Sequence, residues 1–159
     1  MSIQVGDRIP EAKLTMMTPE GPDAQSTSEY FAGRTVVLFA VPGAFTPTCS
    51  AKHLPGFIEL EADIRGKGVD AIACMAVNDV FVMSAWGKSA NAGGIDMLAD
   101  GNGAFTAALG LGMDASAFGM GQRSQRFALV AEDGVVTQLF VEAPGEFRVS
   151  AAEHVLQSL

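Results

Sequence analysis

The chain has 159 residues, 48% of them apolar, which fits one globular domain over residues 1–159 with an adequate core. Its formal net charge of −8 disfavours nucleic acid and anionic membrane surfaces as partners. No apolar run approaches the roughly 20 residues that span a bilayer, and the N-terminus has no apolar signal core, so we expect a soluble, cytoplasmic protein.

Short apolar runs alternate with helical patterns along the chain. The run at residues 34–41 is β-branched and continuous, and with the run at 69–77 it predicts buried strands; residues 12–18 and 94–100 predict two further strands, the second a short one. A helical pattern follows each run. The first helix begins at a capping Ser26 or Ser28, and the other three cover residues 49–68, 78–90 and 103–111. Pro55 lies inside the second of these helices and is expected to kink it.

The last third of the chain adds a hairpin and a final helix. Residues 125–143 read as two strands around Asp133 and Gly134, and residues 150–159 as a helix. The glycine-containing stretch 110–121 lacks the ordered Gly-x-Gly-x-x-Gly of a dinucleotide site and is expected to be a loop. Alternating elements of this kind predict an α/β fold with a central mixed sheet flanked by helices.

Cys49 is the residue whose surroundings most suggest chemistry. It follows the strand at 34–41 across a turn and opens a helix, a position where α/β folds often carry their sites. The N-terminus of a helix favours thiolate over thiol. Pro42 and Pro47 stiffen the turn, and the Thr46 hydroxyl can donate to or accept from a substrate oxygen. A lone cysteine is usually inert core, but an inert cysteine needs neither rigid flanks nor a helix terminus.

The segment PGAFTPTCSAKHLPGF, residues 42–57, resembles the active-site segment of the peroxiredoxins, specifically the atypical peroxiredoxin-5-like branch that includes the plant type II enzymes. The resemblance continues through residues 74–88 and 121–136 and so covers essentially the whole chain. It implies a thioredoxin-like fold. It also implies reduction of hydrogen peroxide and organic hydroperoxides by a cysteine, without metal, haem or another cofactor.

The same resemblance implies a role for each matching residue. Cys49 resembles the peroxidatic cysteine, whose thiolate attacks the peroxide O–O bond and becomes sulfenic acid. Thr46 resembles the hydroxyl that orients the peroxide, and Pro42 the proline that shields the thiolate from water. The family also uses an arginine from a distant strand. Of the two candidates, Arg123 and Arg126, we favour Arg126, because it stands immediately before the apolar strand FALVAEDG.

His53 lies four residues after Cys49 and therefore on the same face of the helix. A cationic His53 would stabilise the thiolate, whereas a neutral one would pack and form local hydrogen bonds in support of the site. We favour the second interpretation. His154 is expected to be an ordinary helix residue, and two distant histidines with only two cysteines make no metal-ligand cluster.

The oxidised sulfur has to be reduced again, and Cys74 is the one internal candidate for a resolving thiol. Plant type II members resemble this chain in carrying a second cysteine at this place. A disulfide needs Cα atoms within about 7 Å, which a helix-start residue and a mid-strand residue are not expected to reach without local unfolding. Residues 143–154 lack the resolving cysteine of mammalian-type members. We therefore expect an external reductant, either glutathione with glutaredoxin or thioredoxin.

Two other classes of function compete with an enzyme: a non-enzymatic peroxide-sensing or thiol-binding module, and a structural thioredoxin-like interaction domain. The resembled branch commonly forms dimers through loops near the active site, so a homodimer is expected. Phe81, Met83 and Trp86 lie close together in the sequence and are expected to be core residues, with some at an interface.

Overall fold

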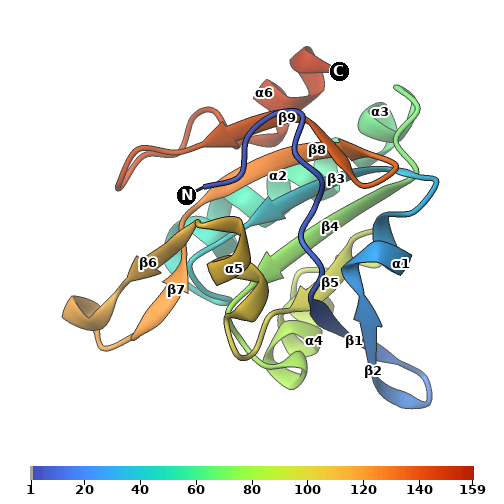
Figure 1. The fold of residues 1–159 in the computed structure, drawn as a ribbon. Helices are drawn as coiled ribbons and strands as arrows, with labels where there is room; N and C mark the ends of the chain where they lie inside the picture. The colour runs from blue at the N-terminus through green and yellow to red at the C-terminus, as the bar shows by residue number, and fades with distance from the viewer. Residues whose placement is uncertain (1) are drawn as a thin grey trace.

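A seven-stranded mixed sheet forms the centre of the molecule (Figure 1). The structure is a computed structural model that describes residues 2–159. The strands lie in the order β2-β1-β5-β4-β3-β8-β9. Their bounds are β1 Lys13–Thr18, β2 Gly21–Ser26, β3 Thr35–Ala40, β4 Ala71–Ala76, β5 Asp96–Ala99, β8 Phe127–Glu132 and β9 Val135–Val141. β3, β4 and β5 are parallel, while the strands on either side of them are antiparallel.

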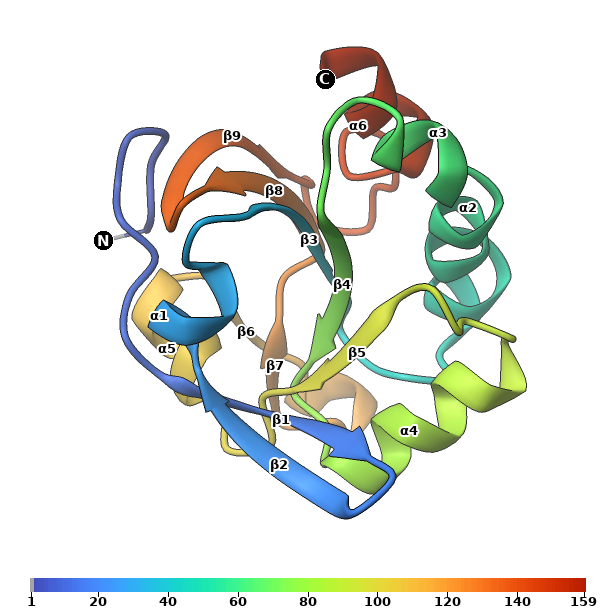
Figure 2. The same ribbon diagram turned by 90° about the vertical axis from the view of Figure 1, so that its right-hand side faces the viewer.

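Helices cover both faces of this sheet (Figure 2). One face carries the π-helical turn η1 (Cys49–His53), α2 (Leu54–Glu59), α3 (Glu61–Arg65), α4 (Val80–Ser89) and α6 (Ala152–Ser158). The other carries α1 (Thr27–Phe31) and α5 (Ala104–Leu109). β3 explains this arrangement, because Val37 and Phe39 pack into the first layer while Val36 and Leu38 pack into the second. The predicted α/β class with a helix-flanked mixed sheet is confirmed.

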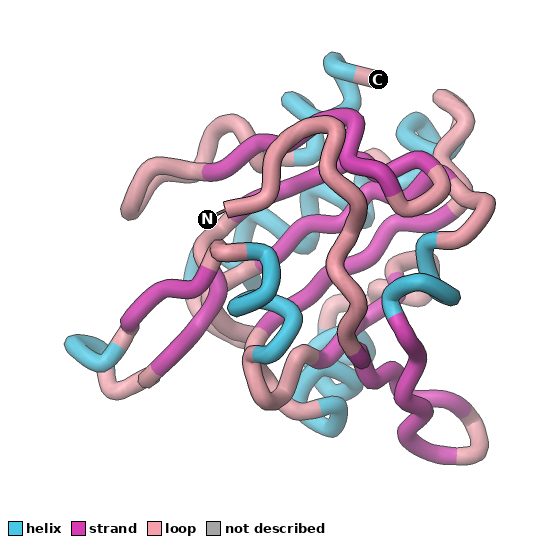
Figure 3. The backbone as a smooth tube through the Cα atoms, in the orientation of Figure 1, coloured by secondary structure: helices cyan, strands magenta, loops and turns pink. Residues whose placement is uncertain are grey.

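Two short ribbons differ from the expectations. No strand was predicted between residue 18 and the cap at Ser26 or Ser28, but β2 pairs with β1 along its whole length, from Lys13↔Ser26 to Thr18↔Gly21. The expected loop at 110–121 contains β6 (Gly112–Asp114) and the 3-10 turn η2 (Ser116–Phe118), and β6 pairs with β7 (Gln122–Ser124) in a ribbon that projects from the body (Figure 3). Both predictions were wrong because backbone pairing, rather than alternation of apolar side chains, defines these strands.

The helix after β3 is divided into pieces. It is helical from residue 47, widens into the π-turn η1, and continues as α2 and α3. The backbone N–H of Leu54 bonds to the carbonyl of Cys49, five residues before it. Pro55 lacks an N–H and its ring would clash with the carbonyl four residues earlier in a regular helix. Where a kink at Pro55 was predicted, the structure has a wide turn just ahead of the proline.

The predicted cap at Ser26 and the predicted hairpin turn are present, and Asp79 caps a second helix. Ser26 accepts a hydrogen bond from the Glu29 backbone at 3.1 Å, and Asp79 accepts one from the Val82 backbone at 2.8 Å. The hairpin between β8 and β9 turns at Asp133 and Gly134, both with positive φ (49° and 78°). No helix within residues 2–159 is long and apolar enough to cross a membrane.

Candidate active site

Cys49 follows a tight turn at the carboxyl end of β3 and has no exposed surface (0%). Hydrogen bonds hold this turn in place. The Thr46 hydroxyl donates to the Gly43 carbonyl at 2.7 Å, and the Ala44 backbone donates to the side-chain oxygen of Asn78 at 2.9 Å. The second bond ties the turn to the segment that follows β4. The sulfur is therefore presented by a fixed loop at the edge where the parallel strands end.

Arg126 reaches the sulfur from the strand next to β3. β3 and β8 are antiparallel neighbours in which Ala40 lies opposite Phe127, so the residue before β8 stands beside the end of β3. The Nη2 group of Arg126 donates to Cys49 Sγ at 3.1 Å, and its Nη1 group donates to His53 Nδ1 at 2.8 Å. Arg126 thus places a charged donor against a buried sulfur, and such charge-assisted contacts are stronger than those between neutral groups.

His53 is neutral and lies between Arg126 and a backbone carbonyl. Burial, and after it the positive charge of Arg126, lowers the pKa of His53 from 6.5 to about 3. A guanidinium only donates, so Nδ1 accepts and the ring proton is on Nε2, which donates to the Ser150 carbonyl at 2.9 Å. A cationic His53 beside the thiolate therefore does not fit these contacts, whereas packing and local hydrogen bonding do.

Sequence reasoning missed the outer part of this arrangement. Ser150 takes part through its backbone carbonyl, which no side-chain pattern reveals. Phe147 lies with its ring centroid 5.0 Å from that of His53 and 5.8 Å from Arg126 Cζ. Glu142 is buried at the end of β9. A glutamate directly after the apolar run LFV was a readable signal, because buried carboxylates are rare unless they are hydrogen-bonded.

The other predicted residues lie around the turn. The Thr46 hydroxyl uses its proton on the Gly43 carbonyl, so in this arrangement it offers lone pairs rather than a proton. Pro42 is partly buried at the start of the turn. Arg123, the disfavoured candidate, donates to the Met120 carbonyl at 2.8 Å and to the Pro42 carbonyl at 3.4 Å. It thus contacts the turn rather than the sulfur.

Cys74 lies in the middle of β4 with no exposed surface (0%). It pairs with Phe39 of the parallel strand β3, and both side chains pack in the same core as Cys49. Both cysteines are free thiols. Burial, and after it the nearby Cys49, raises the pKa of the Cys74 thiol, although Arg126 acts in the opposite direction. Cys74 is therefore held as an unreactive thiol in this conformation.

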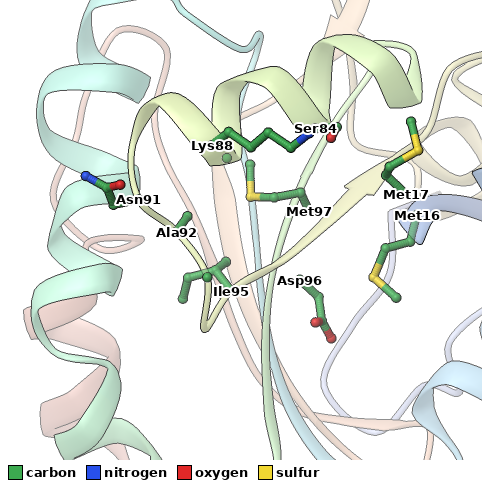
Figure 4. Close-up of a pocket in the computed structure, with 11 residues that line it drawn as sticks. Met16, Met17, Ser84, Lys88, Asn91, Ala92, Ile95, Asp96 and Met97 are labelled. Atoms are coloured by element: carbon green, nitrogen blue, oxygen red, sulfur yellow. The ribbon is translucent and has the colours of Figure 1, made fainter. Parts of the chain in front are cut away.

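A groove of about 620 Å³ lies elsewhere, between α4, β1 and β5 (Figure 4). β1 pairs with β5 only at Thr15↔Ala99, and beyond this point the two strands diverge (Figure 2). Met16, Met17 and Met97 line the opening. None of the predicted site residues Cys49, Thr46, Arg126, Pro42 and His53 lines this groove. Within residues 2–159 no group of three or more His, Cys, Asp or Glu side chains is arranged to hold a metal ion.

Comparisons with known proteins identify relatives of this chain. The Redoxin family model matches residues 4–156. Peroxiredoxin-2E-2, chloroplastic, of Oryza sativa subsp. japonica is 52% identical over 99% of this chain and 73% of its own length. Peroxiredoxin-2B of Arabidopsis thaliana is 48% identical over 99% and 98%, respectively. The crystal structure of reduced Prx3 in complex with H2O2 from Vibrio vulnificus has 55% identity and a TM-score of 0.96, covering 98% of both chains.

The thioredoxin-like fold, with a buried cysteine against an arginine, defines a thiol-based redox protein. Within that class the chain belongs to the Redoxin family, as a peroxiredoxin of the type II and peroxiredoxin-5-like branch. It is an enzyme, a thiol peroxidase, rather than a non-enzymatic sensing or thiol-binding module or a structural interaction domain.

The neutral His53 makes stability depend on pH. The unfolded imidazole takes up a proton near pH 6.5, but the folded one only near pH 3, so between these values the unfolded state binds more protons. The free energy of unfolding therefore falls on acidification. We expect His53→Gln to remove up to about 1.4 kcal/mol per pH unit of this fall, measured by urea unfolding from pH 6.5 to 4. Equal slopes for the two proteins would contradict the buried neutral state.

Proposed function

We propose that Cys49 is the peroxidatic residue of this enzyme and that its substrates are hydrogen peroxide and organic hydroperoxides. The thiolate attacks one peroxide oxygen, so that an S–O bond forms as the O–O bond breaks. The sulfur loses two electrons and becomes sulfenic acid after proton transfer, and the other oxygen leaves as water or an alcohol. The contact of 3.1 Å between Arg126 Nη2 and Cys49 Sγ is the observation that carries the proposal.

The surrounding groups supply stabilisation and shape. Arg126 presents several N–H groups in a planar fork, so it can serve both the attacking sulfur and the oxygen that develops negative charge. Thr46 offers an acceptor lone pair for the proton of a hydroperoxide, which would orient the O–O bond. Pro42 contributes apolar surface at the turn, without a backbone N–H, and limits the access of water to the thiolate.

Substitutions at Cys49 and Arg126 test these roles. Cys49→Ser should abolish peroxide reduction and keep the fold. Arg126→Ala should slow oxidation of Cys49 about a hundredfold, ~3 kcal/mol, the usual loss for one missing donor to a developing charge. Stopped-flow mixing with hydrogen peroxide gives the rate, and Arg148→Ala, which changes an exposed side chain, is the control. Retained turnover in Cys49→Ser would overturn the assignment.

We also propose that an outside thiol reduces the oxidised Cys49. Cys74 is buried in the middle of a strand and its pKa is raised, and residues 143–154 carry no cysteine. The sulfenic acid would condense with a small thiol such as glutathione, releasing water and forming a mixed disulfide that glutaredoxin exchanges off. Thioredoxin is the alternative reductant. Cys49 itself has no exposed surface, so its helical turn must open before any of these partners can reach the sulfur.

Mass spectrometry after one equivalent of peroxide, followed by glutathione, identifies the route. We expect a sulfenic acid that converts into a glutathione adduct at Cys49, in the wild type and in Cys74→Ala alike. An internal Cys49–Cys74 disulfide in the wild type would assign the resolving role to Cys74 instead. In steady-state assays, full activity with thioredoxin and none with glutathione plus glutaredoxin would contradict the glutathione route.

The enzyme is proposed to act as a homodimer. Three phenylalanines are exposed around the end of the sheet that carries Cys49: Phe45 (53%), Phe81 (64%) and Phe118 (82%). Phe45 follows β3, Phe81 lies in the first turn of α4, and Phe118 lies on the ribbon whose Arg123 contacts Pro42. Exposed aromatic side chains gathered on one side of a small protein are typical of an interface.

Light scattering after size-exclusion chromatography measures this assembly. We expect the wild type to elute with the mass of two chains and Phe118→Asp to shift toward one chain, because a buried carboxylate opposes association. Val5→Asp is the matched control, since Val5 is also exposed (60%) but lies in the N-terminal segment beside β9. A monomeric wild type would contradict the proposal.

A further inference from the structure

Glu142 is a buried carboxylate with an unusual set of partners. Its Oε2 atom accepts three hydrogen bonds, from the Arg148 backbone at 2.7 Å, the Ser150 backbone at 2.8 Å and the Ser150 hydroxyl at 2.6 Å. Within residues 2–159 no cationic side chain forms an ion pair with it. Burial raises the pKa of Glu142, but these hydrogen bonds outweigh it and leave the pKa below its usual value. The Glu142 carboxylate therefore holds the loop that contains Arg148 and Ser150 in place.

That loop, residues 143–151, ends at the carbonyl that orients His53. The Ser150 carbonyl accepts from His53 Nε2 at 2.9 Å, and this bond fixes the ring proton on Nε2. The free lone pair on Nδ1 then accepts from Arg126 Nη1 at 2.8 Å. With its proton on Nδ1 instead, His53 would present an N–H to the N–H of Arg126, and the two groups would repel.

Glu142 also holds Arg126 directly, through the backbone. Phe127 pairs with Val141 in β8 and β9, so the preceding residue Arg126 lies opposite Glu142, and the Glu142 N–H donates to the Arg126 carbonyl at 3.0 Å. The same loop places Phe147 against the outer side of the Arg126 guanidinium, 5.8 Å from Cζ to the ring centroid. Backbone and side chain of Arg126 are thus both fixed by groups that depend on Glu142.

We propose that Glu142 is a positioning residue for peroxide reduction, acting through Ser150, His53 and Arg126 on the sulfur of Cys49. It does not touch the sulfur, so it is not a catalytic residue. Its carboxylate fixes the Ser150 carbonyl, the carbonyl fixes the His53 tautomer, and the tautomer fixes one N–H of Arg126. The second N–H is then aimed at Sγ. This inference rests on the proposed function of Cys49 and Arg126.

Glu142→Gln and the matched control Glu146→Gln test the proposal. Glu146 lies in the same loop but is half-exposed and forms only a long ion pair with Arg148, at 3.7 Å. Stopped-flow fluorescence of Trp86, whose Nε1 donates to the Ser50 hydroxyl beside Cys49, follows oxidation by hydrogen peroxide. We expect Glu142→Gln to slow this step about tenfold, as is typical when the outer partner of an oriented histidine is weakened. Glu146→Gln should keep the wild-type rate.

A double-mutant cycle separates positioning from a general effect on the fold. In an Arg126→Lys background the rigid fork is absent, so adding Glu142→Gln should cause no further slowing. The ¹⁵N NMR signals of His53 supply a second readout: they should report a proton on Nε2 in the wild type and a mixture of tautomers in Glu142→Gln. Ser150→Ala removes one of the three donors and leaves the carbonyl, so it should show a smaller loss of rate than Glu142→Gln.

The outcomes distinguish this proposal from the function on which it rests. A wild-type rate in Glu142→Gln, or equal slowing with and without Arg126, overturns the positioning role. If Arg126→Ala slows oxidation while Glu142→Gln does not, only the positioning role fails. If Cys49→Ser and Arg126→Ala both keep full activity, the proposed function itself fails. Urea unfolding of each variant establishes that the rates are compared between folded proteins.

Discussion

The contact between the Arg126 guanidinium and the Cys49 sulfur is the interaction on which the rest of the site depends. The sulfur is removed from bulk water and Arg126 is partly buried, so the charge of the guanidinium is less screened at the sulfur than it would be in water. Such a contact is favourable only if the geometry is held, because an arginine with one free end would turn toward solvent. The neighbours of Arg126 supply that restraint through His53 and the loop that follows β9.

The sheet topology explains why two residues separated by 77 positions meet. β3 lies between β4 and β8, parallel to the first and antiparallel to the second. The end of β3 therefore adjoins both the end of β4 and the start of β8. The turn before Cys49 consequently receives Asn78 from one side, while the sulfur receives Arg126 from the other. A mixed sheet is needed for this, since a fully parallel neighbour would begin at the opposite edge.

Much of the fold follows from sequence patterns, because β3, β4 and the hairpin around Asp133 have strong and local signals. β2 and the β6–β7 ribbon lack such signals, since polar residues at an edge are held by backbone pairing alone. Cys49 could be predicted from its position after a buried strand, and Arg126 from a family resemblance. Ser150 could not be predicted, because it acts through a backbone carbonyl that only tertiary folding brings close to His53. The position of Glu142 after an apolar run was a signal, but its partners in the following loop leave no spacing to read.

The π-turn ahead of Pro55 divides one helix into two mechanical parts. The part after Pro55 is anchored to the rest of the molecule. The ring of Phe57 stacks on that of Phe39, with 4.0 Å between their centroids. The Arg65 side chain donates to the backbone carbonyls of Asp70 and Gly94 at 2.8 and 2.9 Å. The part before Pro55 carries the Cys49 sulfur, and Pro55 lacks the N–H that would form one of the hydrogen bonds between the two parts. Motion of the sulfur toward solvent can therefore be confined to about one turn, so the enzyme can open its reactive centre without loosening its core.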